Sequence, residues 1–262
     1  MEQPQGTSPD VRSLDDRQVA DLYLDLAFPP GTARPYTVLN TVVSLDGKTT
    51  RDGRSTAIGS ALDRVLLRRV RAAAEGVIVA AGTLRAEEIE FRFPPELQAR
   101  RAQAGLPAAF VVVIVSARGE LPLQRRLFSS PTPEITPVVL TTQRADPAAL
   151  ERLAGRARVL VVGAEEVDLP RAMAMLTQDF GVRRLVLEGG ASFNAAMLGA
   201  DLVDEIFCTL APLVLGGPAL TMVAGPGPLR GGPRRLALLS ALDHGGELYL
   251  RYRVSHDARP SR

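Results

Sequence analysis

The stretch of sequence that decides the fold is RLVLEGGASFNAAMLGADLVDEIFCTLAPLVLGG, from Arg184 to Gly217. It begins with a short apolar run, Leu185 to Leu187, which predicts a buried strand. Gly189 and Gly190 then allow a sharp turn, and the spacing of apolar residues from Phe193 to Leu198 predicts a helix. A second apolar run follows that helix, so the predicted order is strand, turn, helix, strand.

A turn of this kind leaves backbone N–H groups free at the start of the helix. These groups point beyond the carboxyl end of the strand, and glycines there let a phosphate approach closely. The geometry therefore favours an anionic cofactor. Two glycines after a strand also occur in plain tight turns, so this motif alone leaves both interpretations open.

Length and composition describe a globular chain with a sizeable core. The chain has 262 residues, of which 46% are hydrophobic and 23% are charged, which is enough for one large core or two small ones. The formal net charge is only +2. The arginines are scattered rather than gathered into one basic block, which argues against a nucleic-acid partner.

Cysteine and histidine are too few for two common kinds of site. One cysteine, Cys208, and two histidines exclude a disulfide framework and a Cys/His zinc site within one chain, so no metal is expected. No apolar run approaches the roughly 18 residues of a membrane span, and the first residues, MEQPQGTSPDVR, lack the features of a signal peptide. We therefore expect a cytoplasmic protein without a membrane partner.

Strands and helices are predicted to alternate along most of the chain. Apolar runs predict strands at 36–44, 76–80, 110–115, 138–141, 159–162 and 185–187, and helical spacing predicts helices at 60–74, 96–104, 147–154 and 170–180. The alternation predicts an α/β fold with a mainly parallel central sheet and helices on both faces. The end of the chain differs, because 236–243 and 247–254 flank a His-Gly-Gly turn and predict an antiparallel hairpin.

The first thirty or so residues are predicted to form an extension. Residues 1–12 are polar and contain prolines, which is typical of disorder. Ser13 and Asp16 resemble a capping box, and the apolar spacing that follows predicts an amphipathic helix to about Ala27. We divide the chain into a disordered start (1–12), an N-terminal helix extension (13–33), one domain (34–256) and a short tail (257–262).

Four loops follow predicted strands and call for a common explanation. They are SLDGK (44–48), AGTLRAEE (81–88), VSARGELP (115–122) and EGGASFN (188–194). In an open α/β sheet, ligands bind outside the carboxyl ends of the strands, so these loops can line one cleft. A cleft built in this way suits a dinucleotide.

In their order, these motifs resemble the reductase domain of bacterial riboflavin biosynthesis, which shares the fold of dihydrofolate reductase. The resemblance runs from about Pro35 to Val254. It rests on S-L-D-G at 44–47, on a variant of G-x-x-T-V-x-x-D at 81–87 with Leu for Val and Glu for Asp, and on E-G-G and A-P-x-x-x-G-G at 188–190 and 211–217. It implies a single dihydrofolate-reductase-like domain.

The resemblance also implies an activity. Members of the family transfer a hydride from NADPH to 5-amino-6-(5-phosphoribosylamino)uracil, whose sugar opens to an imine and is reduced to the ribityl amine. The family forms homodimers. Bifunctional members carry a zinc deaminase domain with H-x-E and P-C-x-x-C motifs, which are absent here. We therefore expect a stand-alone pyrimidine reductase, with the deamination performed elsewhere.

The loops after the strands are the implied contacts of NADPH. Thr83 can donate a hydrogen bond to a phosphate, and Glu87 can accept one from a ribose hydroxyl. Ser116 and Arg118 suit the 2′-phosphate of NADPH, because a guanidinium grips a phosphate with two bonds; a solvated surface arginine is the alternative. The pyrophosphate would lie against Gly189, Gly190, Ala191, Ser192, Phe193 and Asn194.

Other residues match the positions through which the family binds its substrate. Ser55 and Arg71 are carried over from the family, and Lys48 would face the substrate phosphate. Arg71 takes the place of the phosphate-binding arginine. Its neighbours Arg68 and Arg69 are rivals for that role, and a solvated helix face is the alternative interpretation.

Two carboxylates are candidates for catalysis. Glu188 ends a buried strand, and because a lone carboxylate is seldom buried without a partner, we expect it to contact the substrate. Asp46 has two interpretations. It can protonate the imine nitrogen as a general acid with a raised pKa, or it can hold a turn, as Asp before Gly often does.

One loop departs from the family pattern. Where the family has Asp-Asn-Pro or Asp-Asp-Pro and then a substrate-contacting arginine, this chain has Glu-Glu-Ile-Glu-Phe-Arg from Glu87 to Arg92, so Arg92 would take the place of that arginine. Two alternatives therefore stay open: an NADPH-dependent reductase of dihydrofolate or a pterin-like compound, and a nucleotide-binding protein without catalysis.

Overall fold

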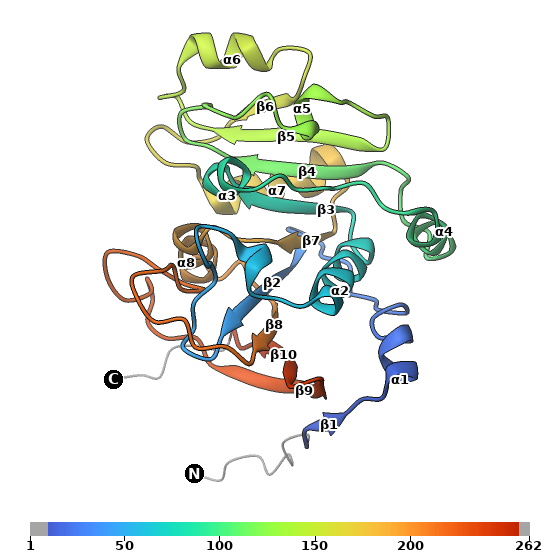
Figure 1. Cartoon of the computed structure of the whole chain (residues 1–262). Helices are drawn as coiled ribbons and strands as arrows, with labels where there is room; N and C mark the ends of the chain where they lie inside the picture. Colours follow the sequence, from blue (N-terminus) through green and yellow to red (C-terminus); the bar gives the residue numbers. More distant parts are fainter. Residues whose placement is uncertain (1–9, 257–262) are drawn as a thin grey trace.

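Ten strands form one mixed sheet in the computed structural model, which describes residues 10–256 (Figure 1). The strand order is β1-β9-β10-β8-β2-β7-β3-β4-β5-β6. The strands are β1 (Arg12–Ser13), β2 (Tyr36–Ser44), β3 (Gly76–Ala80), β4 (Phe110–Val115), β5 (Ile135–Thr141), β6 (Arg158–Val161), β7 (Arg184–Leu187), β8 (Glu205–Ala211), β9 (Leu236–His244) and β10 (Glu247–Val254). The helices are α1 (Asp16–Asp21), η1 (Ser55–Ala57), α2 (Ala61–Ala72), α3 (Ala81–Ala86), α4 (Pro95–Gln103), α5 (Arg126–Ser129), α6 (Pro147–Leu153), α7 (Leu169–Phe180) and α8 (Ala191–Gly199).

The central strands are parallel and the end of the chain is antiparallel. Strands β8, β2, β7, β3, β4, β5 and β6 pair in parallel. The hairpin of β9 and β10 joins this sheet because β10 pairs antiparallel with β8. The predicted α/β fold, with its C-terminal hairpin, is confirmed.

Alternating apolar side chains build a core on each face of the sheet. In β3, Val77 and Val79 belong to one cluster, whereas Ile78 between them belongs to the other. Residues of α2 to α6 pack in the first cluster, and residues of α7 and α8 pack in the second. Strands buried on both faces read as continuous apolar runs, which is why the sequence revealed them clearly.

The short strand β7 positions the site. It lies between β2 and β3, and its four residues pair with only the first half of β2, from Tyr36 to Leu39. The chain visits β3 to β6 before it returns to β7 and crosses to β8, so the strand order reverses here. Such a switch point, outside the carboxyl ends of parallel strands, is where ligands bind in α/β sheets.

The N-terminal extension differs from the prediction. Asp15, not Ser13, caps α1, and Gln18 completes the capping box. The helix ends at Asp21 rather than near Ala27, because the following side chains leave the helix to pack against the first core cluster. Tertiary packing overrides the local helical pattern here.

The prediction for the first twelve residues is also wrong in part. Arg12 and Ser13 form β1, which pairs in parallel with β9 at the edge of the sheet. The predicted disorder of residue 12 is therefore wrong, since this segment finds backbone partners on β9 that its own composition does not reveal. Residues 1–9 and the predicted tail, 257–262, lie outside the described residues.

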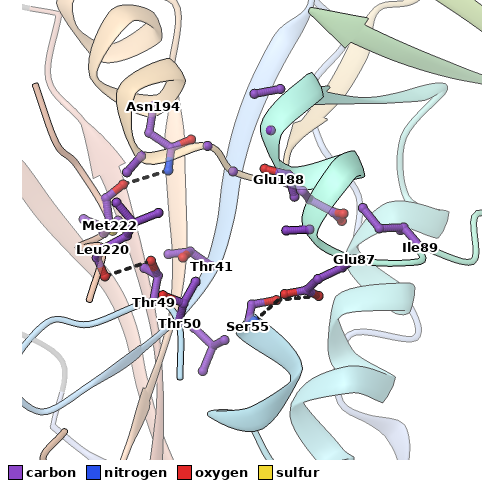
Figure 2. A pocket seen from close by; sticks show the side chains of 18 of the residues that line it. Thr41, Thr49, Thr50, Ser55, Glu87, Ile89, Glu188, Asn194, Leu220 and Met222 are labelled. Carbon is purple, nitrogen blue, oxygen red and sulfur yellow. Dashed lines mark hydrogen bonds between the residues drawn. The ribbon is translucent and has the colours of Figure 1, made fainter. Parts of the chain in front are cut away.

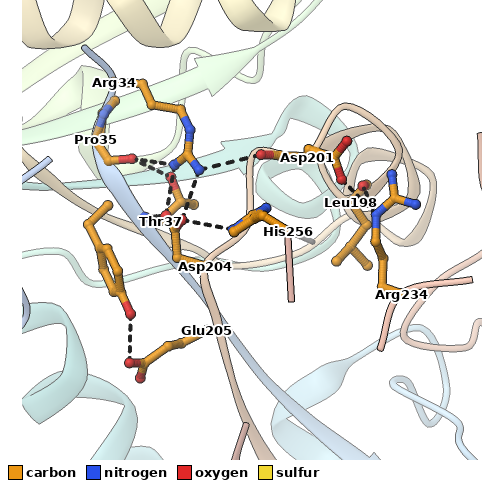
Figure 3. A network of polar contacts seen from close by, with 10 residues as sticks. Arg34, Pro35, Thr37, Leu198, Asp201, Asp204, Glu205, Arg234 and His256 are labelled. Carbon is orange, nitrogen blue, oxygen red and sulfur yellow. Dashed lines mark hydrogen bonds and ion pairs between the residues drawn. The ribbon is translucent and has the colours of Figure 1, made fainter. Parts of the chain in front are cut away.

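A polar network ties β2 and β8 together at their amino ends (Figure 3). Arg34 donates to both carboxylate oxygens of Asp204, over 2.7 and 2.8 Å. The same carboxylate accepts from the backbone of Thr37, over 2.7 Å, and lies 3.1 Å from His256 Nε2. Because Asp204 is 9% exposed, its charge depends on these partners.

We expect Asp204→Asn to lower the free energy of unfolding by about 3 kcal/mol, because it leaves the Arg34 guanidinium without its charged partner. The matched change Asp201→Asn affects a carboxylate whose side chain is 59% exposed and which pairs with Arg234. It should cost less than about 1 kcal/mol. Urea denaturation of both variants measures the difference, and equal losses would contradict a structural role of Asp204.

A second buried carboxylate lies near the start of α2. Asp63 is 8% exposed, and burial raises its pKa to about 6; the neighbouring Glu247 adds to this rise, whereas a hydrogen bond from Thr209 opposes it. Glu247 itself accepts hydrogen bonds from the backbone and hydroxyl of Ser60, which caps the helix. The helix start is therefore tied to β10 through an acidic cluster.

This cluster predicts a pH dependence of stability. The folded-state pKa of Asp63, about 6, lies above the ordinary value of 3.8, so the native state holds the proton more tightly. Its contribution is fully present below about pH 4 and is lost as the pH rises through 6. Asp63→Asn should raise the free energy of unfolding at pH 8 by up to about 3 kcal/mol. At pH 4 it should have little effect.

Chemical denaturation at both pH values measures this difference, and the exposed Asp10→Asn serves as the control. A variant as sensitive to pH between 4 and 8 as the parent chain would rule out Asp63 as the source.

Candidate functional site

A cavity of about 1030 Å³ opens beside β7, beyond the carboxyl end of β3 (Figure 2). Its walls come from β2, the loop before α2, α2 itself, α3 and the loop after it, the turn into α8, and the segment 218–222. The predicted site residues that line it are Ser55, Arg71, Thr83, Glu87, Glu188, Gly189, Gly190, Ala191, Ser192, Phe193 and Asn194.

One end of the cavity is built to admit an anion. Gly189 and Gly190 have φ values of +86° and +94°, and a Cβ on Gly190 would lie 2.6 Å from the Cβ of Ala80. No side chain caps the start of α8, so the N–H groups of its first turn remain available to a ligand. Thr83 Oγ1 lies beside both glycines. These features fit the phosphates of a dinucleotide.

Two asparagines leave polar atoms for a ligand. Asn194, 2% exposed, donates through Nδ2 to the backbone oxygen of Met222 over 2.8 Å (Figure 2). Its Oδ1, and Nδ2 of Asn40, are buried and have no hydrogen-bond partner within residues 10–256. Both residues line the cavity. Because buried polar atoms are normally paired, these two atoms are suited to a guest.

Arg71 and Glu188 are paired with each other. Nε and Nη2 of Arg71 donate to the two carboxylate oxygens of Glu188 over 2.6 and 2.5 Å, and Nη1 donates to the backbone oxygen of Glu90. Both side chains are 6% exposed. The expectation that Glu188 contacts the substrate rested on its being a lone buried carboxylate, whereas a guanidinium 117 residues away in the chain supplies a partner.

Glu87 joins two walls of the cavity. Its carboxylate accepts hydrogen bonds from the backbone N–H and from the hydroxyl of Ser55, the latter over 3.0 Å (Figure 2). The contact fastens the loop before α2 to the end of α3. Ser55, which was assigned to the substrate, and Glu87, which was assigned to a ribose of the cofactor, are therefore neighbours.

Asp46 lies outside the cavity lining and holds a turn. It accepts hydrogen bonds from the Ser44 hydroxyl and from the backbone N–H groups of Leu215 and Gly216. These bonds, the Ser44 bond first, lower the pKa of Asp46 to about 2. The lowered pKa is opposite to the raised pKa that the general-acid interpretation required, so the hydrogen bonds favour the interpretation of Asp46 as a turn residue. The contact instead joins the S-L-D-G and A-P-x-x-x-G-G motifs.

Four further predicted residues are not part of the cavity lining. Ser116 is buried and Arg118 is exposed at the end of β4, one strand farther from β7 than β3. Lys48 forms a bridge with Thr221 instead. Arg92 makes a bidentate pair with Glu90, over 2.8 and 2.7 Å.

Sequence reasoning missed one wall of the cavity. The segment 218–222 reaches it because Thr49 donates through its backbone N–H and its hydroxyl to the oxygen of Leu220, over 2.7 and 3.1 Å (Figure 2). Val42, Thr41 and Asn40 of β2 also line it. A local motif cannot reveal these contacts, although A-P-x-x-x-G-G marked the start of the segment.

The part of the chain that the structure describes contains no cluster of three or more His, Cys, Asp or Glu side chains suited to a metal ion. Nor does any helix in residues 10–256 combine the length and apolar character that crossing a membrane requires.

Comparison with known proteins identifies the family. The model of the RibD C-terminal domain matches residues 35–250, which is most of the chain. The chain belongs to the RibD C-terminal domain family. This membership agrees with the switch-point cavity and with the order of the motifs around it.

Two relatives with similar sequences share a name. The 2,5-diamino-6-ribosylamino-4(3H)-pyrimidinone 5′-phosphate reductase of Methanothermobacter thermautotrophicus is 32% identical over 195 residues, 74% of this chain and 86% of that protein. The protein of the same name from Aquifex aeolicus is 32% identical over 201 residues, 74% of this chain and 84% of that protein.

A solved structure supports the fold. A pyrimidine reductase-like protein from Corynebacterium diphtheriae superimposes with a TM-score of 0.76 at 24% identity, over 85% of this chain and 93% of that one. At this identity, the structural similarity supports the fold alone.

The family's glycine turn generates a stability prediction. Gly190→Ala places a side chain at φ +94° and against Ala80, so it should lower the free energy of unfolding by about 1–3 kcal/mol. Gly82 also lines the cavity, in α3, and a Cβ there would meet no atom within 4 Å.

Gly82→Ala is therefore the matched control. It should be neutral or stabilising by up to about 1 kcal/mol, because alanine is the better helix former. Thermal melting of the two variants compares them, and equal melting temperatures would show that the turn is not constrained as described.

Proposed function

We propose that this chain is an NADPH-dependent reductase of riboflavin biosynthesis, which reduces the ribosylamino group of a phosphorylated pyrimidine to the ribityl form. The observation that carries the proposal is the cavity beside β7 in a chain of the RibD C-terminal domain family. The names of the relatives support it, since proteins 32% identical to this chain are reductases of such a pyrimidine.

The cofactor half of the proposal rests on the start of α8. Gly189, Gly190 and the first turn of α8 would hold the pyrophosphate through backbone N–H groups, and Thr83 would add a hydroxyl. NADPH, when bound, supplies the hydride. Ser116 and Arg118 would extend this site towards the 2′-phosphate, which is the part of the proposal that separates NADPH from NADH.

The substrate half of the proposal rests on the opposite wall. Arg71 and Glu188 form a rigid, buried pair, so they would present a fixed surface to the pyrimidine rather than a mobile charge. The unpaired Asn40 Nδ2 would donate to a carbonyl oxygen of the ring. Since both oxygens of Glu188 are engaged by Arg71, we propose a positioning role for Glu188 rather than proton donation.

The two candidate pyrimidines differ at one substituent of the ring. Resemblance to the bacterial reductase domain predicts 5-amino-6-(5-phosphoribosylamino)uracil, whereas the relatives' name specifies the 2,5-diamino form. The sugar and its phosphate, on which the reduction takes place, are common to both. The homodimer that the resemblance implies also remains a prediction.

Oxidation of NADPH by the purified chain, followed at 340 nm, tests the proposal. We expect turnover with one or both pyrimidine phosphates and none with dihydrofolate, with NADPH preferred over NADH. Arg152→Ala, a change on the exposed face of α6 and outside the cavity lining, serves as the control variant and should retain activity.

Other outcomes separate the alternatives. Turnover of dihydrofolate alone would replace the substrate half of the proposal and keep its cofactor half. NADPH binding without turnover of any of these compounds would instead support a nucleotide-binding protein without catalysis.

A further inference from the structure

A second, smaller cavity of about 100 Å³ lies between the N-terminal extension, α2 and α4. It opens on another face of α2 than the large cavity, and the three helices α1, α2 and α4 lie along one side of the molecule (Figure 1). Four arginines line it: Arg69 of α2, Arg100 and Arg101 of α4, and Arg184 of β7. Its lining within residues 10–256 contains no aspartate or glutamate.

Two of the four guanidinium groups have a carboxylate partner outside the cavity lining. Arg184 pairs with Glu75 over 2.6 Å. Arg100 pairs with Asp25 over 3.0 Å, and the side chain of Asp25 is 96% exposed. Solvent screens the second pair, so it contributes little to holding Arg100 in place.

The other two guanidinium groups, Arg69 and Arg101, form no ion pair in the part of the chain that the structure describes. Arg69 donates to three backbone oxygens at the end of α1. Arg101 is 3% exposed and donates to three backbone oxygens at and beyond the ends of α2 and α4. A guanidinium has five N–H groups, so each of the two keeps a pair of donors that these bonds do not use.

The surroundings of these two side chains disfavour their positive charge. Burial lowers the pKa of Arg101 to about 10, although the charge of Glu75 opposes the change. Burial and, after it, the charge of Arg100 lower the pKa of Arg69. Buried charges normally have a partner of opposite sign. Beside this cavity, two positive charges lack one.

The size of the cavity limits what could supply the missing negative charge. A volume of about 100 Å³ is roughly three times the share of one water molecule in the liquid. It is well below the roughly 300 Å³ at which pockets for larger organic ligands begin. A tetrahedral oxyanion fits into this space, whereas a nucleotide does not.

We infer that this cavity binds a small, doubly charged oxyanion, phosphate or sulfate, between the N-terminal extension and α4. Two negative charges would balance the two guanidinium groups that lack an ion pair, and guanidinium groups bind such oxyanions through parallel hydrogen bonds. The ion would fasten the extension to α2 and α4. The inference is independent of the proposed reductase activity, because the cavity lies apart from the one beside β7.

Hydrogen–deuterium exchange of the whole chain, followed by mass spectrometry, tests this site. Phosphate and sulfate are titrated separately against chloride at the same ionic strength. At an ion concentration ten times the dissociation constant, amides of residues 19–28 that exchange only after release of the ion should exchange about 10-fold more slowly. The ion that acts at the lower concentration is the preferred ligand.

Two substitutions should change the dissociation constant in opposite directions. Arg100→Gln removes a charged donor and should weaken binding about 10- to 100-fold. Asp25→Asn releases Arg100 from its exposed carboxylate and should tighten binding about 2- to 5-fold. Arg152→Gln, on the exposed face of α6, is the matched control and should leave binding unchanged.

The comparison between segments and between variants is needed because phosphate and sulfate also stabilise folded proteins in general. Equal slowing of exchange throughout the chain would overturn the inference, and so would an unchanged dissociation constant in Arg100→Gln. Slowing confined to the start of α8 would place the ion in the large cavity instead.

Two further outcomes bear on the identity of the ion and on the choice of variant. Acetate carries one charge, so protection by acetate equal to that by phosphate would contradict a site for a doubly charged ion. If Arg100→Gln does not fold, Asp25→Asn still decides, because its substitution is at an exposed side chain. Unchanged or weaker binding in Asp25→Asn would overturn the inference.

Discussion

The early end of β7 is the constraint on which the site depends. This strand stops after four residues, whereas its neighbour β2 continues to Ser44. At its end the chain stays tied to β3, because Glu188 donates through its backbone to Ile78 and Gly189 accepts from Ala80. The sheet therefore divides beyond this point, and the cavity occupies the space between β2 and the turn into α8.

The Arg71–Glu188 pair stabilises the end of β7, where the sheet divides. Burying two charges costs desolvation, and a bidentate geometry offsets this cost only when both partners are present. The pair links α2 to the end of β7, so it fixes the distance between the two halves of the cavity.

Some residues of the family-like motifs contact one another. The S-L-D-G turn and the A-P-x-x-x-G-G segment meet through Asp46, and the E-G-G turn and the segment 218–222 meet through Asn194. These contacts bring together loops that are distant in the chain. Residues that resemble ligand contacts can therefore serve as joints between loops, and only the geometry tells the two roles apart.

The sequence by itself determined most of the strands and helices and the glycine turn, because apolar periodicity and backbone freedom are local properties. It also indicated that one cleft gathers Thr83, Glu188 and Asn194, since parallel strands end at a common edge. The tertiary structure decided the partners. Three contacts join residues that are distant in the chain: Arg71 with Glu188, Asp46 with Gly216, and Arg69 with the end of α1. Side-chain pairing across such separations follows from packing, which no local pattern encodes.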